Sequence, residues 1–148
     1  MSPASFAEVK PVLDRRPGTW PTNKNADYFA ARDGDTIVGV AAVSWHPGHA
    51  RFKSAWVVPE RRREGIGHRL FEARLQAARD RGLSTVKATC TEDSLPMFLR
   101  EGAFVTRRHA GPRTADVTLP LYPGGAEGAA AALRASQTAL RARRRPRR

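Results

Sequence analysis

Apolar and polar residues alternate over much of the first half of the chain, as they do in strands that bury one face. Strands are predicted over 28–32 and 36–45, because Asp33-Gly34 between them supplies the left-handed backbone that a tight turn needs. A further strand is predicted over 50–58, ending at Pro59, which cannot donate a hydrogen bond to a strand ladder. These segments predict a hairpin followed by a third strand.

The period of the pattern changes after this strand. Apolar residues now recur every three or four positions, as on one face of a helix, at Ile66, Leu70, Phe71, Leu75 and Ala78. The spacing predicts a helix over 66–81 with Gly82 as its C-cap. The elements expected beyond it are a strand over 84–90, a short helix over 94–100 and a hairpin formed by 104–109 and 115–121.

The N-terminal residues complete the predicted domain. Ser5 is a suitable N-cap for a short helix over 6–16, whose length Pro11 limits, and 17–27 are rich in turn formers and predict a loop. Together these elements predict one mixed α/β domain over 1–122. Residues 123–148 change to a Gly/Ala linker and a basic tail, which we interpret as an appendage.

The charge of the chain is concentrated in that tail. The net charge is +12, and the 134–148 segment contains seven arginines and no acid. Such a block can dock on phosphates, so nucleic acid is a candidate partner, although charge runs are often only solvated ends. No apolar run is long enough to cross a bilayer and the N-terminus does not have the pattern of a secretory signal, so we expect a cytoplasmic protein without a membrane partner.

Composition gives little support to a metal site. The single cysteine, Cys90, excludes an intramolecular disulfide and a cysteine-based zinc site. Of the four histidines, only His46 and His49 are close in sequence, on a His-Pro-Gly-His turn that lacks helical i, i+4 presentation. We therefore expect no metal.

The segment 57–70 carries the most chemical information. It places a strand, three consecutive arginines, Gly65 and Gly67 directly before the predicted helix. Glycines let the backbone approach an anion closely, and the first amides of a helix point at the same place. Position 70 is leucine, so a G-x-G-x-x-G dinucleotide loop is not completed, and no Gly-Lys-Ser/Thr follows for a nucleoside triphosphate.

The spacing Arg62-x-x-Gly65-x-Gly67, preceded by Val-x-Pro-Glu, resembles the acyl-CoA signature of the GNAT N-acetyltransferase superfamily. The resemblance extends over 28–121 and includes Gly-Ala-Phe104 after the short helix. It implies a GNAT-like mixed central sheet with splayed motif strands, helices on both faces, and here a basic C-terminal extension. A plain strand–helix turn, in which the glycines only permit tight packing, is the simpler alternative.

The resemblance also implies which residues hold acetyl-CoA. Backbone amides of the loop would bind the pyrophosphate, and this loop consists of Arg62, Arg63, Glu64, Gly65, Ile66, Gly67 and His68. Val57 and Val58 would contact the pantetheine arm, which lies between splayed strands like an added strand. An amide near Val57 would polarise the thioester carbonyl. Thr91 or Ser94 would replace an asparagine that commonly contacts the pantetheine.

The catalytic groups of the family are not all present. The tyrosine that commonly protonates the leaving thiolate falls on Leu99, or on Phe98 if the alignment slips by one. Cys90, Thr91 and Ser94 are the nearest substitutes by motif position, although Cys90 is more simply a small buried residue. His46 and His49 are candidates for the general base, because histidine titrates near neutrality.

The resemblance implies direct transfer of an acyl group, most simply acetyl, from acetyl-CoA to a primary amine. The acceptor is not legible in the sequence, and the short region before the hairpin implies an open site that a second copy of the chain could close. The alternatives are a protein of this fold that modifies nucleic acid or a protein bound to it, and a non-catalytic CoA-binding module, which the missing tyrosine favours.

Overall fold

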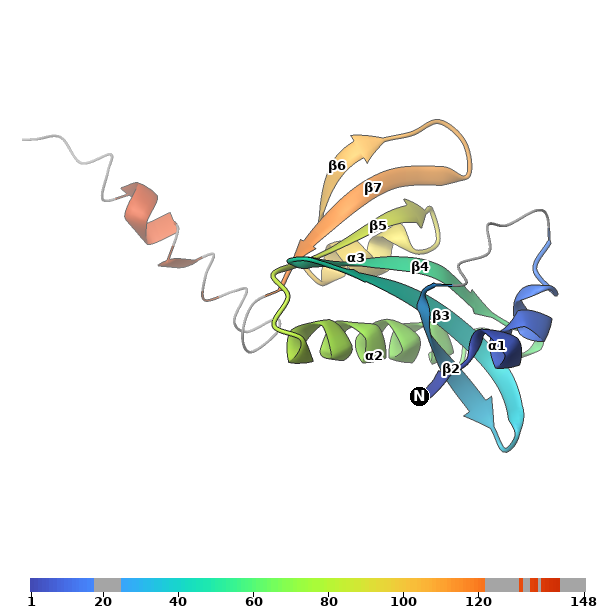
Figure 1. Ribbon diagram of the computed structural model, residues 1–148. Helices are drawn as coiled ribbons and strands as arrows, with labels where there is room; N and C mark the ends of the chain where they lie inside the picture. The colour runs from blue at the N-terminus through green and yellow to red at the C-terminus, as the bar shows by residue number, and fades with distance from the viewer. Residues whose placement is uncertain (18–24, 122–130, 132–133, 136, 142–148) are drawn as a thin grey trace, which may run out of the picture.

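The computed structural model describes residues 1–17, 25–121, 131, 134–135 and 137–141. Its centre is a sheet of seven strands in the order β1-β2-β3-β4-β5-β7-β6 (Figure 1). The strands are β1 (Ser2–Ala4), β2 (Asp27–Asp33), β3 (Thr36–His46), β4 (His49–Val57), β5 (Thr85–Thr91), β6 (Phe104–Arg108) and β7 (Arg113–Pro120). The strands predicted from the sequence are confirmed within a few residues, and β1 was not predicted.

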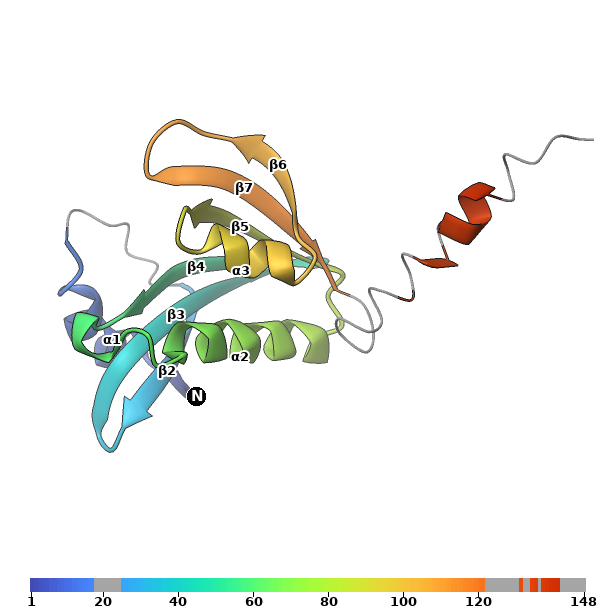
Figure 2. The ribbon, with the colours of Figure 1, turned by 180° about the vertical axis from the view of Figure 1, so that it is seen from behind.

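Helices cover both faces of the sheet, as predicted. Helix α1 (Phe6–Leu13) lies on one face over β2 and β3, whereas α2 (Ile66–Asp80) and α3 (Leu95–Arg100) lie on the other face (Figures 1 and 2). A short 3₁₀ turn, η1 (Pro59–Arg61), joins β4 to the loop that begins α2. The alternation of the chain between strand and helix periods therefore gives a mixed α/β fold, as predicted.

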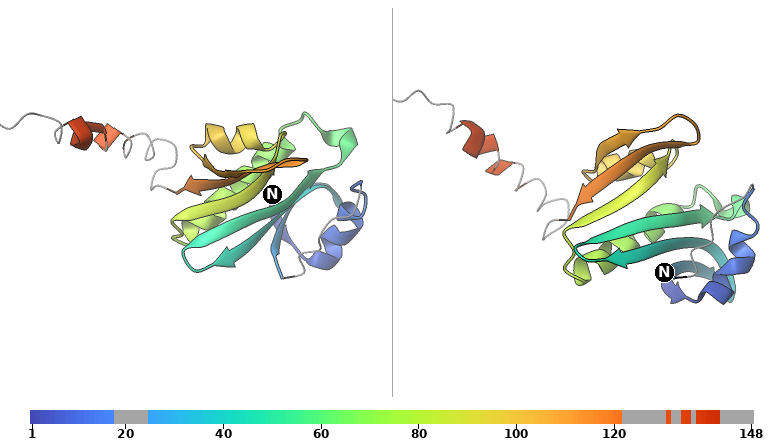
Figure 3. Two further views of the ribbon diagram at one scale, coloured as in Figure 1. Left: turned by 90° about the horizontal axis from the view of Figure 1, so that it is seen from above. Right: turned by 45° about the horizontal axis from the view of Figure 1, so that its top comes forward.

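The strands β4 and β5 form the one parallel pair in the described sheet, and they separate along their length (Figure 3). Their pairing runs from His49 opposite Thr85 to Phe52 opposite Ala88 and stops there. A β-bulge follows immediately, because Ala42 pairs with Lys53 but Val40 pairs with Trp56. Ser54, inside the bulge, has a φ of 48°. The bulge bends β4 away from β5 and confirms the predicted splay.

Aromatic rings fill the space between the sheet and the two helices on its α2 face. Phe52 of β4, Phe71 of α2 and Phe98 of α3 meet there, with the Phe71 and Phe98 rings 4.8 Å apart and nearly perpendicular. At the first residue of α2 the approach to the sheet is close, because a Cβ on Gly39 would lie 2.9 Å from Ile66 Cγ2. Gly39 therefore allows the first turn of α2 to touch β3.

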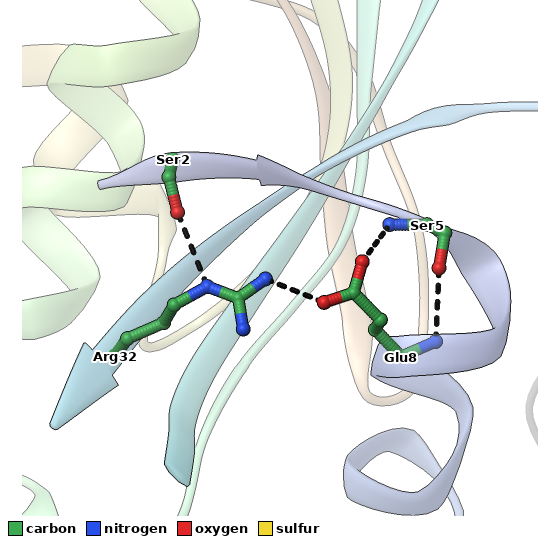
Figure 4. Close-up of polar contacts among 4 residues, drawn as sticks. All are labelled: Ser2, Ser5, Glu8 and Arg32. Atoms are coloured by element: carbon green, nitrogen blue, oxygen red, sulfur yellow. Dashed lines mark hydrogen bonds and ion pairs between the residues drawn. The ribbon is translucent and has the colours of Figure 1, made fainter. Parts of the chain in front are cut away.

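The N-terminal elements are fixed by a small polar network (Figure 4). Ser5 and Glu8 form a capping box at the start of α1, and Arg32 of β2 donates to Glu8 at 2.8 Å and to Ser2 at 3.2 Å. The hydrogen bond from the Ser5 amide, together with that from Arg32, lowers the pKa of Glu8 to about 2. The helix ends at Leu13, earlier than the predicted 16, and Pro11 lies within it.

The C-terminal appendage is described only at residues 131, 134–135 and 137–141, which are helical. The predicted linker at 123–128 and most arginines of the tail lie outside the described residues, so the predicted boundary near 122 stays a prediction. Most of the loop predicted over 17–27 lies outside them too. Among the helices that are described, none has the length and apolar character needed to cross a membrane.

Candidate active site

The first turn of α2 presents unpaired backbone amides. Gly65 is the N-cap and has a φ of 80°, and no side chain caps the helix. The first backbone bond runs from the Arg69 amide to the Gly65 carbonyl at 3.1 Å, so the helix itself provides no acceptor for the amides of Ile66, Gly67 and His68. Because the positive end of the helix dipole lies at the same point, the turn is suited to bind an anion.

Two of the three arginines beside this turn already have partners. Arg61 contacts Glu64 at 2.9 Å and Asp33 at 2.7 Å, and Arg62 donates to the Val57 carbonyl at 3.0 Å. Arg63 differs, because it is exposed and its side chain forms neither a hydrogen bond nor an ion pair within the described part of the chain. Arg63 is therefore the loop cation that is available to a ligand.

The two glycines of the motif serve different purposes. Gly65 needs its left-handed conformation, which L side chains rarely adopt. A Cβ on Gly67 would lie 3.9 Å from Val57 Cγ2, which is ordinary contact, so packing within the protein does not require glycine there. This observation counts against the alternative that both glycines only permit tight packing.

A cavity of about 430 Å³ opens where β4 and β5 separate. Residues from β4, β5, α2, α3 and β7 contribute to its wall, which consists of Arg16, Arg51, Phe52, Lys53, Ser54, Ala55, Trp56, Arg74, Ala88, Thr89, Thr91, Ser94, Met97, Phe98 and Arg113. Of the predicted site residues, Thr91 and Ser94 lie here, and the Ser94 hydroxyl accepts a hydrogen bond from the Thr91 amide at 3.0 Å. The structure thus brings this predicted pair to the cavity.

Val57 and Val58 are not part of the cavity wall. The Val58 side chain is buried and its amide donates to the Val38 carbonyl at 2.9 Å, while the Val57 carbonyl accepts from Arg62. The segment of β4 that faces the cavity is instead 51–56, which includes the bulge. A ligand in the cavity would contact β4 earlier along the strand than the motif suggested.

The structure does not bring His46 and His49 to this cavity. They lie at the β3–β4 turn with their rings stacked 4.8 Å apart, and His49 is opposite Thr85 at the closed end of the parallel pair. Along an extended strand, His49 is about 16 Å from Ser54. Burial, more than the neighbouring His49, lowers the pKa of His46. We leave both histidines out of the proposed machinery.

Cys90 does not line the cavity, although the wall residue Ser94 contacts its thiol. The Cys90 side chain is 1% exposed and belongs to the core on the α3 side of β5. Burial raises the pKa of the thiol. A buried, protonated thiol is a poor nucleophile, so the simpler interpretation of Cys90 as a small core residue is favoured.

Phe98 and Leu99 have opposite orientations, which decides between the two alignments of the missing tyrosine. Phe98 is 4% exposed and lines the cavity, whereas Leu99 is 44% exposed. The position that faces the cavity is therefore Phe98, whose ring cannot donate a proton.

Sequence reasoning missed a buried arginine on α2. Arg74 is 2% exposed, lines the cavity and donates to the carbonyls of Ala42 at 3.1 Å and Lys53 at 3.4 Å. Its guanidinium lies 4.3 Å from the centre of the Phe52 ring, and its Nε has no hydrogen-bond partner among the described residues. Burial lowers the pKa of Arg74 to about 9. The sequence could have predicted that Arg74 is buried, because position 74 lies on the apolar stripe of the helix between Leu70 and Ala78.

A second polar group was also missed, because two strands and the loop after β6 assemble it. The Thr89 hydroxyl, in the cavity wall, donates to Asp116 at 2.7 Å, and the His109 Nε2 lies 3.0 Å from the other Asp116 oxygen. The hydrogen bond from Thr89, followed by that from His109, lowers the pKa of Asp116. No local pattern links these positions.

Comparison with known proteins agrees with this geometry. Residues 3–100 match the family model described as the acetyltransferase (GNAT) family. No curated protein matches the sequence.

Solved structures with the same fold are distant in sequence. The ribosomal-protein-S18-alanine N-acetyltransferase from Escherichia coli is 15% identical with a TM-score of 0.67, covering 84% of this chain and 96% of that one. PaiA N-acetyltransferase from Thermoplasma acidophilum, in complex with coenzyme A, is 12% identical with a TM-score of 0.56 over 64% and 60% of the two chains. N-acetylglutamate synthase from Neisseria gonorrhoeae, complexed with coenzyme A and N-acetylglutamate, is 18% identical with a TM-score of 0.56 over 65% and 26%.

Proposed function

Because the chain belongs to the GNAT acetyltransferase family, we propose that it transfers an acetyl group directly from acetyl-CoA to a primary amine. Membership of the family carries acyl transfer from acyl-CoA, with acetyl-CoA as the co-substrate. The observation that carries the proposal for this chain is the uncapped first turn of α2 beside the cavity between β4 and β5.

The residues present fit the co-substrate. In the proposed complex the amides of Ile66, Gly67 and His68, with Arg63, hold the pyrophosphate at the helix N-terminus. The gap beyond the last β4–β5 pair, Phe52 with Ala88, receives the pantetheine arm. Phe52, Ala88, Met97 and Phe98 form an apolar part of the wall that suits an acetyl group.

Direct transfer is the mode that the family resemblance implies, and the composition of the cavity wall supports it. The described residues of the wall include no cysteine or histidine that could carry an acyl group or activate a neighbouring hydroxyl as a nucleophile, and the Cys90 thiol is buried. The acceptor nitrogen therefore attacks the thioester carbon, the carbon–sulfur bond breaks, and the nitrogen loses one proton while the CoA sulfur gains one. Thr91 and Ser94 contribute hydroxyls to the cavity wall that can exchange protons there.

An amine acceptor is also supported by the relatives. The similar structures include proteins named for N-acetylation of an alanine of a ribosomal protein and for synthesis of N-acetylglutamate. Their acceptors differ in size, so the fold alone does not choose one for this chain.

A non-catalytic CoA-binding role is the second candidate, because Phe98 occupies the cavity position where the family commonly has its acid. Measurement of free-thiol release from acetyl-CoA against a panel of amines separates the two. Acceptor-dependent release above the hydrolysis rate is expected. CoA binding without release by any amine would favour the second candidate.

A further inference from the structure

The cavity wall is strongly cationic. Its lining residues include the five basic side chains Arg16, Arg51, Lys53, Arg74 and Arg113, and no aspartate or glutamate. A cavity that binds a polyamine or another cationic acceptor would need acidic residues instead.

Two of these cations project from β4 on the side opposite α2. Phe52 packs against Phe71 of α2, and neighbouring side chains of a strand point to opposite faces, so Arg51 and Lys53 lie on the other face. On that face α1 packs over β2 and β3 (Figure 3). Among the described residues no helix covers the same face of β4, β5 and β7.

The third cation, Arg113, reaches the cavity from the other side of the gap. It begins β7 and pairs with Thr91 at the end of β5. Arg51 and Lys53 on one strand and Arg113 beyond the next therefore flank the opening between β4 and β5.

Carboxylates of the described protein do not neutralise these three side chains. None of Arg51, Lys53 and Arg113 forms an ion pair within the described residues. The acid nearest in the sheet, Asp116, already accepts from Thr89 and contacts His109. Like charges held together repel one another, and a bound anion relieves that repulsion.

We propose that the acceptor is a small amine that carries a carboxylate, and that Arg51, Lys53 and Arg113 bind this carboxylate. The inference rests on the proposed function and adds its substrate class. An acidic acyl group on the donor is the less favoured source of a carboxylate, because the apolar part of the wall, Phe52 with Met97 and Phe98, lies on the opposite face of the sheet from Arg51 and Lys53.

Matched acceptors isolate the contribution of the carboxylate. Thiol release from acetyl-CoA is measured with aspartate against asparagine, glutamate against glutamine, and a diamine of similar length. We expect kcat/KM for at least one acidic member to exceed that of its amide by about tenfold or more, since a hydrogen bond to a charged group commonly contributes that much. Equal rates for both members of each pair, with turnover intact, would overturn the acidic acceptor and leave the acetyltransferase proposal standing.

Matched variants then test whether Arg51 and Lys53 cause the preference for an acidic acceptor. Arg51→Gln combined with Lys53→Gln should remove most of it, measured as the ratio of kcat/KM for each acidic acceptor to that for its amide, at a pH on the plateau of the pH–rate profile of each protein. Lys87→Gln is the control, because Lys87 is exposed and pairs with Arg51 across the sheet but does not line the cavity. A loss of preference in Lys87→Gln as large as in the double variant would show that net charge alone is responsible, and would overturn the local site.

Two further arms separate the failure of this inference from failure of the proposed function. In the first, succinyl-CoA replaces acetyl-CoA. If the reaction is then faster and the double variant loses this gain, the cations bind a carboxylate of the acyl donor, and the proposal of an acidic acceptor is overturned. In the second, the melting temperature is measured with CoA and each amine. If no amine releases thiol, acid-selective stabilisation that the double variant abolishes would support the carboxylate site and refute the transferase, whereas its absence would refute both.

Discussion

A carboxylate at position 67 should separate CoA binding from folding. Gly67 is in the first turn of α2, and a Cβ there meets the protein only at 3.9 Å from Val57 Cγ2. Gly67→Asp should therefore fold normally. An acidic residue in the first turn of a helix stabilises it by about 0.3–1 kcal/mol, and replacing glycine within a helix is also favourable.

The same carboxylate should severely weaken CoA binding. If it lies about 5 Å from one phosphate charge, an effective dielectric constant of about 20 gives a repulsion of roughly 3 kcal/mol, which is about a hundredfold in affinity. The second phosphate charge adds to this. The uncharged variant Gly67→Ala should lose less, because it adds bulk without charge.

Calorimetric titration with CoA and thermal melting of the same preparations give both quantities. Gly39→Ala is the converse control, since its Cβ would lie 2.9 Å from Ile66 Cγ2 and 3.1 Å from Leu70 Cδ1. That variant should lower stability by about 1–3 kcal/mol. Wild-type affinity in folded Gly67→Asp would refute the assignment of the pyrophosphate to this turn.

Three other substitutions test separate parts of the structure. Phe98→Tyr places a hydroxyl on the cavity-facing ring and should leave kcat for thiol release equal or higher across a pH–rate profile; a tenfold fall in a folded variant would show that the ring must be apolar. Arg74→Met should change the urea-derived free energy of unfolding by less than about 2 kcal/mol, because the roughly 5 kcal/mol that the lowered pKa assigns to burying the charge offsets the lost bonds to two carbonyls; a loss above about 4 kcal/mol would contradict this balance. Because the pKa of Glu8 is about 2 in the folded protein, the stabilisation from its ionised carboxylate is fully present above pH of about 4.5 and is lost as the pH falls toward 2. Glu8→Gln should therefore reduce the slope of the free energy of unfolding against pH in that range, and an unchanged slope would show that Glu8 does not cause it.

The elements and the uncapped turn that is proposed to bind an anion could be predicted because their signals are local. The helical spacing from Ile66 to Ala78 and the Gly65-x-Gly67 pair lie within one short segment, and the structure places α2 and its uncapped first turn there. The splay of β4 from β5 was expected from the family resemblance alone, and the β-bulge that produces it was not located. Ser54 takes its positive φ without a glycine, so its sequence carries no mark of the bend.

The residues of the cavity wall could not be predicted in the same way, because segments that are far apart in the sequence form it. Arg51 and Arg113 come together only through the order of β4, β5 and β7, and the Thr89–Asp116–His109 contacts join two strands and the loop after β6. The histidines failed as cavity residues for a related reason. His46 and His49 are close in sequence and their rings stack, but they lie where β4 begins, whereas the cavity lies along the later part of that strand.

The cationic cavity bears on a further question, which is how the acceptor amine loses its proton. A protonated amine cannot attack a thioester, and the cavity wall has no histidine or carboxylate among its described residues to act as a base. Positive charges nearby disfavour the protonated form of the amine and lower its pKa.

The size of this effect can be worked from the charges in the wall. At about 8 Å and an effective dielectric constant of about 20, one cation contributes roughly 2 kcal/mol, or about 1.5 pKa units. A bound carboxylate cancels part of the total from Arg16, Arg51, Lys53, Arg74 and Arg113, but it cannot neutralise five cations. The acceptor amine should then be neutral at a lower pH in the cavity than in water.

The pH dependence of kcat tests this consequence directly. The acidic limb of the wild-type profile should lie below the pKa of the free acceptor, and Arg51→Gln combined with Lys53→Gln should move it to higher pH by about one unit or more. The control variant Lys87→Gln, whose side chain does not line the cavity, should move it less. If the acidic limb keeps its position when both cations are removed, a titrating group of the protein must accept the proton, and the Asp116–His109 pair behind Thr89 is the first place to look for it.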